Sequence, residues 1–150
     1  MYHPAKDNLF TAYLGSGTQL NGKQIKVKDN KSDIEKIELR MSKLWKNNGQ
    51  EERITKLLTP YKVCQYNHSK SMALSYCELA SGQVDGLISI TKDCFPEFAG
   101  SLIVQEAGGM FTNLDGNNNL NLTDRIFVGG KNKEIHQKLL QLTREVSKLN

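Results

Sequence analysis

Residues 95–109 read FPEFAGSLIVQEAGG, and residues 110–116 continue with MFTNLDG. Pro96 suits the first turn of a helix, where its missing N–H would have no partner inside the helix. Apolar residues follow at helical spacing, and the two closing glycines accept the left-handed backbone that often ends a helix. The next segment is typical of a short strand that stops at an Asp-Gly turn. The stretch therefore predicts a buried helix packed on a strand, with Ala99 and Gly100 letting another backbone come close.

The same signals predict most of the remaining elements. An Asn-Gly pair at residues 21–22, between alternating apolar residues, is typical of a type I′ hairpin turn. Together the elements indicate an α/β fold, a mixed β-sheet flanked by helices on both faces. Strands are expected at residues 9–14, 18–20, 23–27, 61–66, 85–90 and 125–128, helices at 49–58, 70–80 and 132–149, and an Asn-rich surface loop at 113–124.

Length and composition indicate one soluble globular domain. The chain has 150 residues, of which 24% are charged and 38% hydrophobic. The net charge of +4 is uneven, since residues 1–63 carry 12 basic against 7 acidic side chains. A basic front half can attract phosphate groups or nucleic acid. Because these basic residues are scattered and lack interleaved aromatic residues, a solvated face is favoured and we expect no nucleic-acid partner.

Cysteine usage and hydropathy point to a cytoplasmic protein. The three cysteines are odd in number and show no C-x-x-C spacing, which fits a reducing compartment better than a disulfide framework. The three histidines show no ligand spacing to them, which argues against zinc. Residues 1–7 have no apolar targeting region, and no run reaches the ~18–20 apolar residues of a membrane span. We therefore expect no membrane partner.

Three segments together resemble the inositol monophosphatase family. Residues 99–109, AGSLIVQEAGG, resemble its second signature, and residues 80–86, ASGQVDG, resemble its Ala-x-Gly-x-x-Asp segment. Residues 2–4 and 20–23 resemble its Tyr-x-Pro and Leu-Asn-Gly-Lys hairpin. The resemblance spans nearly the whole chain but covers only the second half of the family's sequence.

The resemblance implies one domain over residues 1–150, like the C-terminal subdomain of the inositol monophosphatase fold, with the N-terminal metal-binding half absent. It also favours a strand near residues 37–41. Family members are Mg²⁺-dependent phosphomonoesterases, in which the metals polarise the phosphate, generate the attacking hydroxide and stabilise the leaving oxygen. The family takes most of its metal ligands from its first half. Mg²⁺ is therefore the cofactor that the family implies, with an incomplete ligand set in this sequence.

The one ligand expected from the second half is the Asp of a Trp-Asp-x-Ala motif, and it falls on Pro96, which has no side-chain ligand. Asp93 and Glu97 are the nearest carboxylates and are weak candidates for a metal. The alternative is that Glu97 only favours the helix N-terminus electrostatically, while Asp93 sits in solvent. No catalytic residue is assigned.

The family's phosphate-binding Gly-Thr/Ser-Ala segment aligns with residues 70–72. Ser69 and Ser71 are therefore candidates to bind substrate phosphate, together with backbone N–H groups at that helix start. Either serine could equally be a plain helix N-cap that needs no ligand. The family acid that grips a sugar hydroxyl falls on Ser89, which weakens the expectation of inositol as substrate.

Two interpretations remain open. In the first, the chain is a subunit of a Mg²⁺-dependent phosphatase for sugar, inositol or nucleotide phosphates, and its missing half is a separate chain or was removed. In the second, it is a non-catalytic pseudoenzyme or a partner-binding remnant, which Pro96 favours because truncation alone would leave the Asp intact. Under both, the chain alone is expected to be inactive. The expected partners are a small phosphate ester and either a second copy, in a homo-oligomer, or a chain carrying the N-terminal half.

Overall fold

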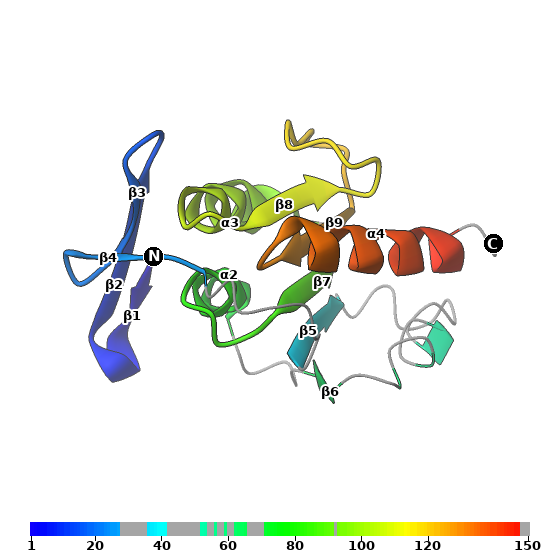
Figure 1. Ribbon diagram of the computed structural model, residues 1–150, viewed down its shortest axis with the longest axis horizontal. Helices are drawn as coiled ribbons and strands as arrows, with labels where there is room; N and C mark the ends of the chain where they lie inside the picture. The colour runs from blue at the N-terminus through cyan, green and yellow to red at the C-terminus, as the bar shows by residue number, and fades with distance from the viewer. Residues whose placement is uncertain are drawn as a thin grey trace.

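A computed structural model describes most of the chain, and Figure 1 shows its elements in layers. Strands β1–β4 form one sheet, α2 and α3 lie next to it, and a five-stranded sheet separates these two helices from α4. The prediction of an α/β fold with a mixed sheet flanked by helices is confirmed. The described residues are 1–27, 36–41, 52, 53, 56, 59, 62–65, 71–91 and 93–147.

The first sheet is an antiparallel meander with strand order β1-β2-β3-β4. Its elements are β1 (Tyr2–His3), the short 3-10 helix η1 (Pro4–Lys6), β2 (Asn8–Tyr13), β3 (Gly17–Leu20) and β4 (Lys23–Ile25). Between β3 and β4, Asn21 and Gly22 have φ angles of 50° and 77°. A type I′ turn requires positive φ at both central residues, so the predicted hairpin is confirmed.

The second sheet is mixed, with strand order β6-β5-β7-β9-β8. Strands β6, β5 and β7 are parallel, whereas β9 runs antiparallel to both β7 and β8. Its strands are β5 (Lys36–Met41), β6 (Lys62–Gln65), β7 (Gly86–Ile90), β8 (Met110–Asn113) and β9 (Ile126–Gly130). The expected strands of both sheets are confirmed, with ends that differ by one or two residues.

The helices confirm three of the predicted helical segments. They are α2 (Met72–Ala80), α3 (Phe95–Glu106), with Pro96 in its first turn, and α4 (Lys133–Ser147). Most of the helix expected at residues 49–58 lies outside the described residues. The described positions in this range, 52, 53 and 56, are helical. Among the described helices, none combines the length and the apolar character needed to cross a membrane.

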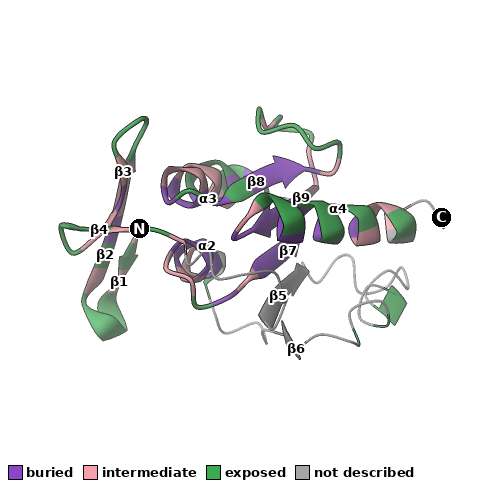
Figure 2. Cartoon of the chain, viewed as in Figure 1, coloured by how far each residue is buried: buried purple, intermediate pink, exposed green. Residues whose placement is uncertain are grey.

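Strand β7 shows why helices cover both faces of the mixed sheet. Successive side chains of a strand point to opposite faces. Leu87 belongs to the apolar cluster that contains Tyr76 of α2, whereas a side chain at Gly86 would meet Leu139 of α4. All of β7 is buried, and Figure 2 shows buried residues concentrated between the helices and this sheet.

The close approach predicted for the 95–109 stretch occurs at Gly100 and not at Ala99. Gly100 is buried and lies against the ring of Tyr76, whereas Ala99 is exposed. The neighbour is therefore an aromatic side chain and not the backbone that we expected. A ring can lie flat on a helix wherever no Cβ stands in its way.

Candidate functional site

The N-terminal ends of α2 and α3 lie at the same end of the molecule, because the two helices pack side by side in the same direction. Tyr76, in the middle of α2, contacts Glu97 near the start of α3. Ala80, at the end of α2, clusters with Ala107 just beyond α3. Ser89, near the end of β7, reaches the same place through Glu97. Helix N-termini carry unpaired N–H groups that attract anions, so we take this junction, the α2–α3 end, as the candidate site.

A buried carboxyl group occupies the interior of the α2–α3 end. Glu97 has an exposed fraction of 0%. The hydroxyl of Tyr76 donates a hydrogen bond to its Oε1 at 2.7 Å, and the hydroxyl of Ser89 donates a second one at 2.9 Å. Its Oε2 is also buried and has no hydrogen-bond partner among the described residues. One carboxyl oxygen thus joins α2, α3 and β7.

The electrostatics of the site favour the neutral form of this carboxyl. Burial raises the pKa of Glu97 above its ordinary value of 4.5, because removal from water penalises the charged form. The hydrogen bonds from Tyr76 and Ser89 lower the pKa, and the negative charge of Asp93 raises it further. Desolvation is the largest of these effects, so the group retains its proton at pH values where an exposed glutamate is ionised.

Asp93 lies at the surface, at the start of α3. Its Oδ1 accepts a hydrogen bond from the backbone N–H of Phe95 at 3.1 Å. The hydroxyl of Thr91 bridges to the backbone of Asp93, accepting from its N–H at 3.1 Å and donating to its carbonyl at 3.0 Å. This carboxylate is therefore engaged with the first turn of the helix, where its charge is favourable.

Of the two candidate serines, Ser71 takes the N-cap position of α2, with extended backbone angles, while Ser69 lies outside the described residues. Ser71 is exposed, and its side chain makes no capping hydrogen bond to the helix. Its N-cap position agrees with the alternative role that we gave it, although its side chain makes no capping hydrogen bond. Whether either serine binds phosphate stays a prediction.

The described residues do not fit the Mg²⁺ site that the resemblance implies. Mg²⁺ requires carboxylates that are charged and can face a shared, partly hydrated position. Pro96 offers no ligand, Glu97 is enclosed in the core, where burial raises its pKa, and Asp93 contacts the backbone of α3. Among the described residues, no three His, Cys, Asp or Glu side chains gather closely enough to hold a metal. The two weak metal candidates, Asp93 and Glu97, therefore lie in separate surroundings, and each makes contacts that serve the fold.

The sequence profile of the inositol monophosphatase family matches residues 1–148. The chain belongs to this family. Membership confirms the resemblance drawn from the three sequence segments.

The chain is similar to several proteins of known sequence or structure. Nus factor SuhB of Vibrio cholerae is 33% identical over 118 residues, which are 77% of this chain and 44% of the relative. The crystal structure of the extragenic suppressor protein suhB from Bartonella henselae matches with a TM-score of 0.82 and 26% identity, over 96% of this chain and 55% of that one. A structure of SaIMPase-II bound to inositol monophosphate matches with a TM-score of 0.77 and 21% identity, over 99% of this chain and 57% of that one, and shows the fold alone.

The chain spans about half the length of the curated relatives it matches. Membership of the family is therefore established, whereas activity, substrate and partners are not. The name Nus factor gives no support to our expectation that the chain has no nucleic-acid partner, which stays untested. The expected cytoplasmic location likewise stays a prediction.

Sequence reasoning did not foresee the buried Glu97 or its two hydrogen-bond donors. We expected Glu97 either near a metal or in an electrostatic role at the helix N-terminus, and neither expectation foresaw its full burial. A signal was present in the spacing, because positions 97, 100, 104 and 107 lie along one side of a helix and all are buried. A buried Tyr hydroxyl also needs a partner, which Tyr76 finds in this carboxyl.

Proposed function

We propose that this chain is the substrate-binding half of a phosphomonoester-processing protein of the inositol monophosphatase family, and that it hydrolyses no phosphate ester by itself. The observation that carries the proposal is the pair Pro96 and Glu97. The position of the expected metal ligand has no carboxylate, and the next residue turns its carboxyl into the core. Without charged ligands, no water is activated and no leaving oxygen is stabilised by a metal.

Binding of a phosphate group fits the start of α2 better than the start of α3. The backbone N–H of Phe95 at the start of α3 already donates to Asp93, whose negative charge repels an anion. The first turn of α2 contains no acidic residue, so no negative side chain there opposes an anion at the helix start. We therefore propose phosphate binding at Ser71 and the first turn of α2.

A full Mg²⁺ site would need carboxylates that the described residues do not offer. In this proposal they come from another part of the assembled protein, either from a separate chain or from sequence outside these residues. The described residues contribute the helix start and the fold that positions it. Mg²⁺-dependent hydrolysis then belongs to the assembly and not to this chain alone.

The test is to measure binding and turnover separately on the purified chain. SaIMPase-II has the same fold and was crystallised with inositol monophosphate and with 2'AMP, so both are suitable probes. We expect either ligand to shift the backbone amide NMR signals of residues 71–75, with no release of phosphate in Mg²⁺. Ser71→Pro, which removes the side-chain hydroxyl and a backbone N–H, should weaken binding, whereas Ser101→Ala on α3 should not. Turnover that EDTA abolishes would contradict the proposal.

A second candidate function, partner binding, is favoured by exposed apolar residues next to the site. Phe95, the first residue of α3, is 72% exposed, and Leu122 is 63% exposed. The two are close in the structure, because Cys94 donates a hydrogen bond from Sγ to the Leu122 carbonyl at 3.4 Å. Exposed apolar side chains that gather together often mark an interface.

Sedimentation tests this second function for the simplest partner, another copy of the chain. We expect the wild type to self-associate at tens of micromolar, on the order expected for weak interfaces, and Phe95→Ser with Leu122→Ser to be monomeric. Leu14→Ser is a matched control, since Leu14 is 87% exposed but lies in the β2–β3 turn, beside the C-terminal end of α3. A wild type that is monomeric throughout would count against self-association.

A further inference from the structure

Glu97 is an acidic side chain in a place where a folded protein rarely keeps a charge. It is fully buried, and its hydrogen-bond partners are the neutral hydroxyls of Tyr76 and Ser89. Moving an unpaired carboxylate into the interior costs several kcal/mol, on the order of what holds a whole domain together. Such a group commonly keeps its proton instead.

The distribution of hydrogen bonds assigns that proton to one oxygen. Both hydroxyls donate to Oε1, and Oε2 receives no donor from the part of the chain that the structure describes. In a carboxylate the two oxygens share the negative charge, and half of it would be left unpaired on Oε2. In a neutral acid, Oε1 is the carbonyl oxygen that accepts both bonds and Oε2 carries the hydrogen. The hydrogen on Oε2 has no acceptor among the described residues, but an unpaired O–H costs less to bury than half a negative charge, so the neutral acid is the favoured form.

The charged and titratable groups around Glu97 add to this preference. From α2 the facing group is the Tyr76 hydroxyl, from β7 it is the neutral Ser89, and from the turn before α3 it is the carboxylate of Asp93. Among the described residues, no Lys, Arg or His forms a hydrogen bond or an ion pair with Glu97. The opposing influence comes from the first turn of α3 itself, whose N–H groups favour a negative charge.

We propose that Glu97 is a proton-dependent latch at the α2–α3 end. The neutral acid holds Tyr76 of α2 and Ser89 of β7 against α3, and loss of its proton separates them. Ionisation leaves a charge that water must reach, and water reaches it only if the helix starts move apart. The closed state is therefore favoured at low pH, and the open state gains population as the pH rises. This inference does not depend on phosphate binding, because every group in it belongs to the chain.

Infrared spectroscopy of the full chain tests the proton directly. We expect the wild type at neutral pH to show the carbonyl stretch of a protonated carboxylic acid, and Glu97→Gln to lack that band. The amide of Gln can accept from the same two hydroxyls without ionising, so this variant mimics the closed latch. If wild type and variant give the same carboxyl spectrum at neutral pH, the proposal is wrong.

Amide hydrogen exchange tests the opening. After correction for the intrinsic effect of pH, local opening of residues 72–80 and 95–100 should rise about tenfold per pH unit above the ordinary glutamate pKa, until the folded group itself ionises. Glu97→Gln should show no such rise, and equal pH dependence in both proteins would overturn the latch. If Glu97→Gln does not fold, a titration of wild-type protein labelled with ¹³C at the glutamate carboxyls decides the question. A glutamate that titrates well above the others supports the latch, and its absence refutes it.

Discussion

The ring of Tyr76 occupies the space where a side chain at Gly100 would stand. A Cβ built on Gly100 would overlap this ring, which is itself held edge-on against Phe111 with ring centres 5.5 Å apart. The contact sets how closely α2 approaches α3, and it places the Tyr76 hydroxyl within reach of Glu97. A glycine in the middle of a helix is therefore required by a neighbouring helix.

We predict that Gly100→Ala destabilises the protein, although alanine is the better helix former. The gain in helix propensity is about 1 kcal/mol, whereas overpacking a core costs about 1–3 kcal/mol. Because Phe111 prevents the Tyr76 ring from moving away, we expect the cost of overpacking to exceed the gain in helix propensity. The net loss of stability should be on the order of 1 kcal/mol. Urea unfolding measures it, and Ser101→Ala at the next position should change little. Stabilisation by Gly100→Ala would mean that the ring moves freely.

The carboxylate of Glu106 connects the end of α3 to the β2–β3 turn. It accepts hydrogen bonds from the backbone N–H of Gly15 and of Gly17, each at 2.8 Å. These bonds lower the pKa of Glu106. A group with a lowered pKa in the folded state stabilises the fold above its ordinary pKa of 4.5, and that contribution disappears as the pH falls through the folded value.

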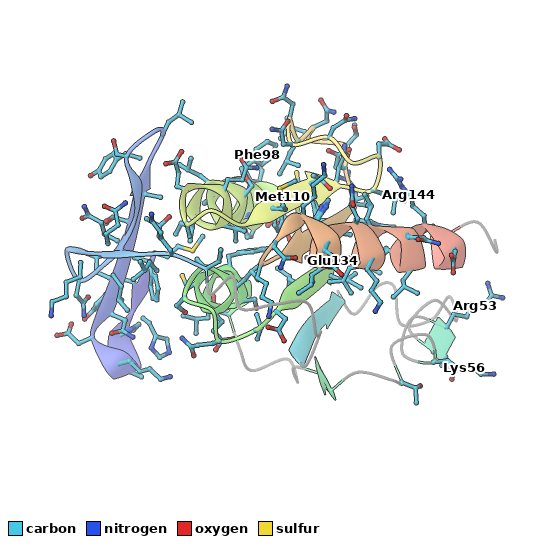
Figure 3. The ribbon with its side chains drawn as sticks, in the orientation of Figure 1. Arg53, Lys56, Phe98, Met110, Glu134 and Arg144 are labelled. Carbon is cyan, nitrogen blue, oxygen red and sulfur yellow. The ribbon has the colours of Figure 1, made fainter. Side chains whose placement is uncertain are left out.

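Glu106→Gln should therefore speed amide exchange at Gly15 and Gly17, because an amide offers one acceptor oxygen where the carboxylate offers two. The variant should also remove part of the acid sensitivity of this turn. NMR exchange rates at the two glycines give the answer. Glu134→Gln on α4, exposed and on another layer of the molecule (Figure 3), is the matched control and should leave both rates unchanged.

A buried ion pair closes the far end of the mixed sheet. Nζ of Lys131 lies 2.8 Å from Oδ1 of Asp85, and the backbone N–H of Lys131 donates to the Asp85 carbonyl at 2.9 Å. The side chains are 5% and 17% exposed. We expect Lys131→Met to destabilise the protein by about 3 kcal/mol, since it removes the buried ammonium group that lies against the Asp85 carboxylate.

The exposed Lys133→Met is the control for this prediction, and its unfolding midpoint in urea should match the wild type. Adding Asp85→Asn to Lys131→Met should recover part of the loss, because the stranded charge is then removed. An unchanged midpoint for Lys131→Met alone would show that water already screens the pair.

His136 gives the fold a second sensitivity to acid. It is 3% exposed, and its Nε2 lies 2.9 Å from Oγ1 of Thr112. The Thr112 hydroxyl donates its hydrogen to the Asn113 carbonyl, so it can only accept a hydrogen bond from His136. Nε2 of His136 therefore carries a hydrogen and donates it to Oγ1 of Thr112. Burial lowers the pKa of His136 below its ordinary 6.5, and the charge of Arg144 adds to the effect.

Because the unfolded chain takes up a proton at this histidine near pH 6.5 and the folded chain does not, stability should fall as the pH drops below 6.5. The slope from this one group is at most about 1.4 kcal/mol per pH unit. His136→Gln should flatten the curve of unfolding free energy against pH between 6.5 and the range where carboxylates titrate. An identical slope in the variant would assign the acid sensitivity to other groups.

The elements with local signals were predictable from the sequence. Asn21-Gly22 predicts its hairpin because few other pairs accept two positive φ angles, and Gly108, with a φ of 87°, follows α3 for the same reason. The strand β1 was missed, since two residues carry no periodicity. The contacts that join the layers also leave no signal in the local sequence. Arg144 reaches from α4 to the Leu114 carbonyl at 2.8 Å (Figure 3), a contact between residues far apart in the chain.

The candidate site was predicted in position but not in character. The helix starts near Ser71 and Pro96 follow from cap and proline rules, and both helices begin close to where we expected. The burial of Glu97 could not be deduced, because sequence patterns count a glutamate as a surface residue. Its partners lie on two other elements, and only the fold brings Tyr76 and Ser89 to it. Tertiary hydrogen bonding thus decided the state of this carboxyl.

The last prediction is that Pro96→Asp does not give the isolated chain phosphatase activity. An aspartate at this position restores the one ligand that the family resemblance expects from these residues. A single carboxylate has too little charge and too few oxygens to replace the water shell of Mg²⁺. Glu97 cannot add a second ligand while its carboxyl is enclosed in the core, where burial raises its pKa, and Asp93 contacts the N–H of Phe95.

The assay is phosphate release from inositol 1-phosphate, fructose 1,6-bisphosphate and adenosine 3′,5′-bisphosphate, with Mg²⁺ and with Mn²⁺. Pro96→Asn is the matched control, because it also restores a side chain and the N–H but adds no charge. We expect neither variant to turn over substrate, and both to fold, since the first turn of a helix tolerates either residue. Turnover by Pro96→Asp that EDTA abolishes, absent from Pro96→Asn, would show that the chain supplies further ligands. Turnover by the wild type that is lost in Glu97→Gln would make Glu97 a metal ligand and refute its role as a buried neutral acid.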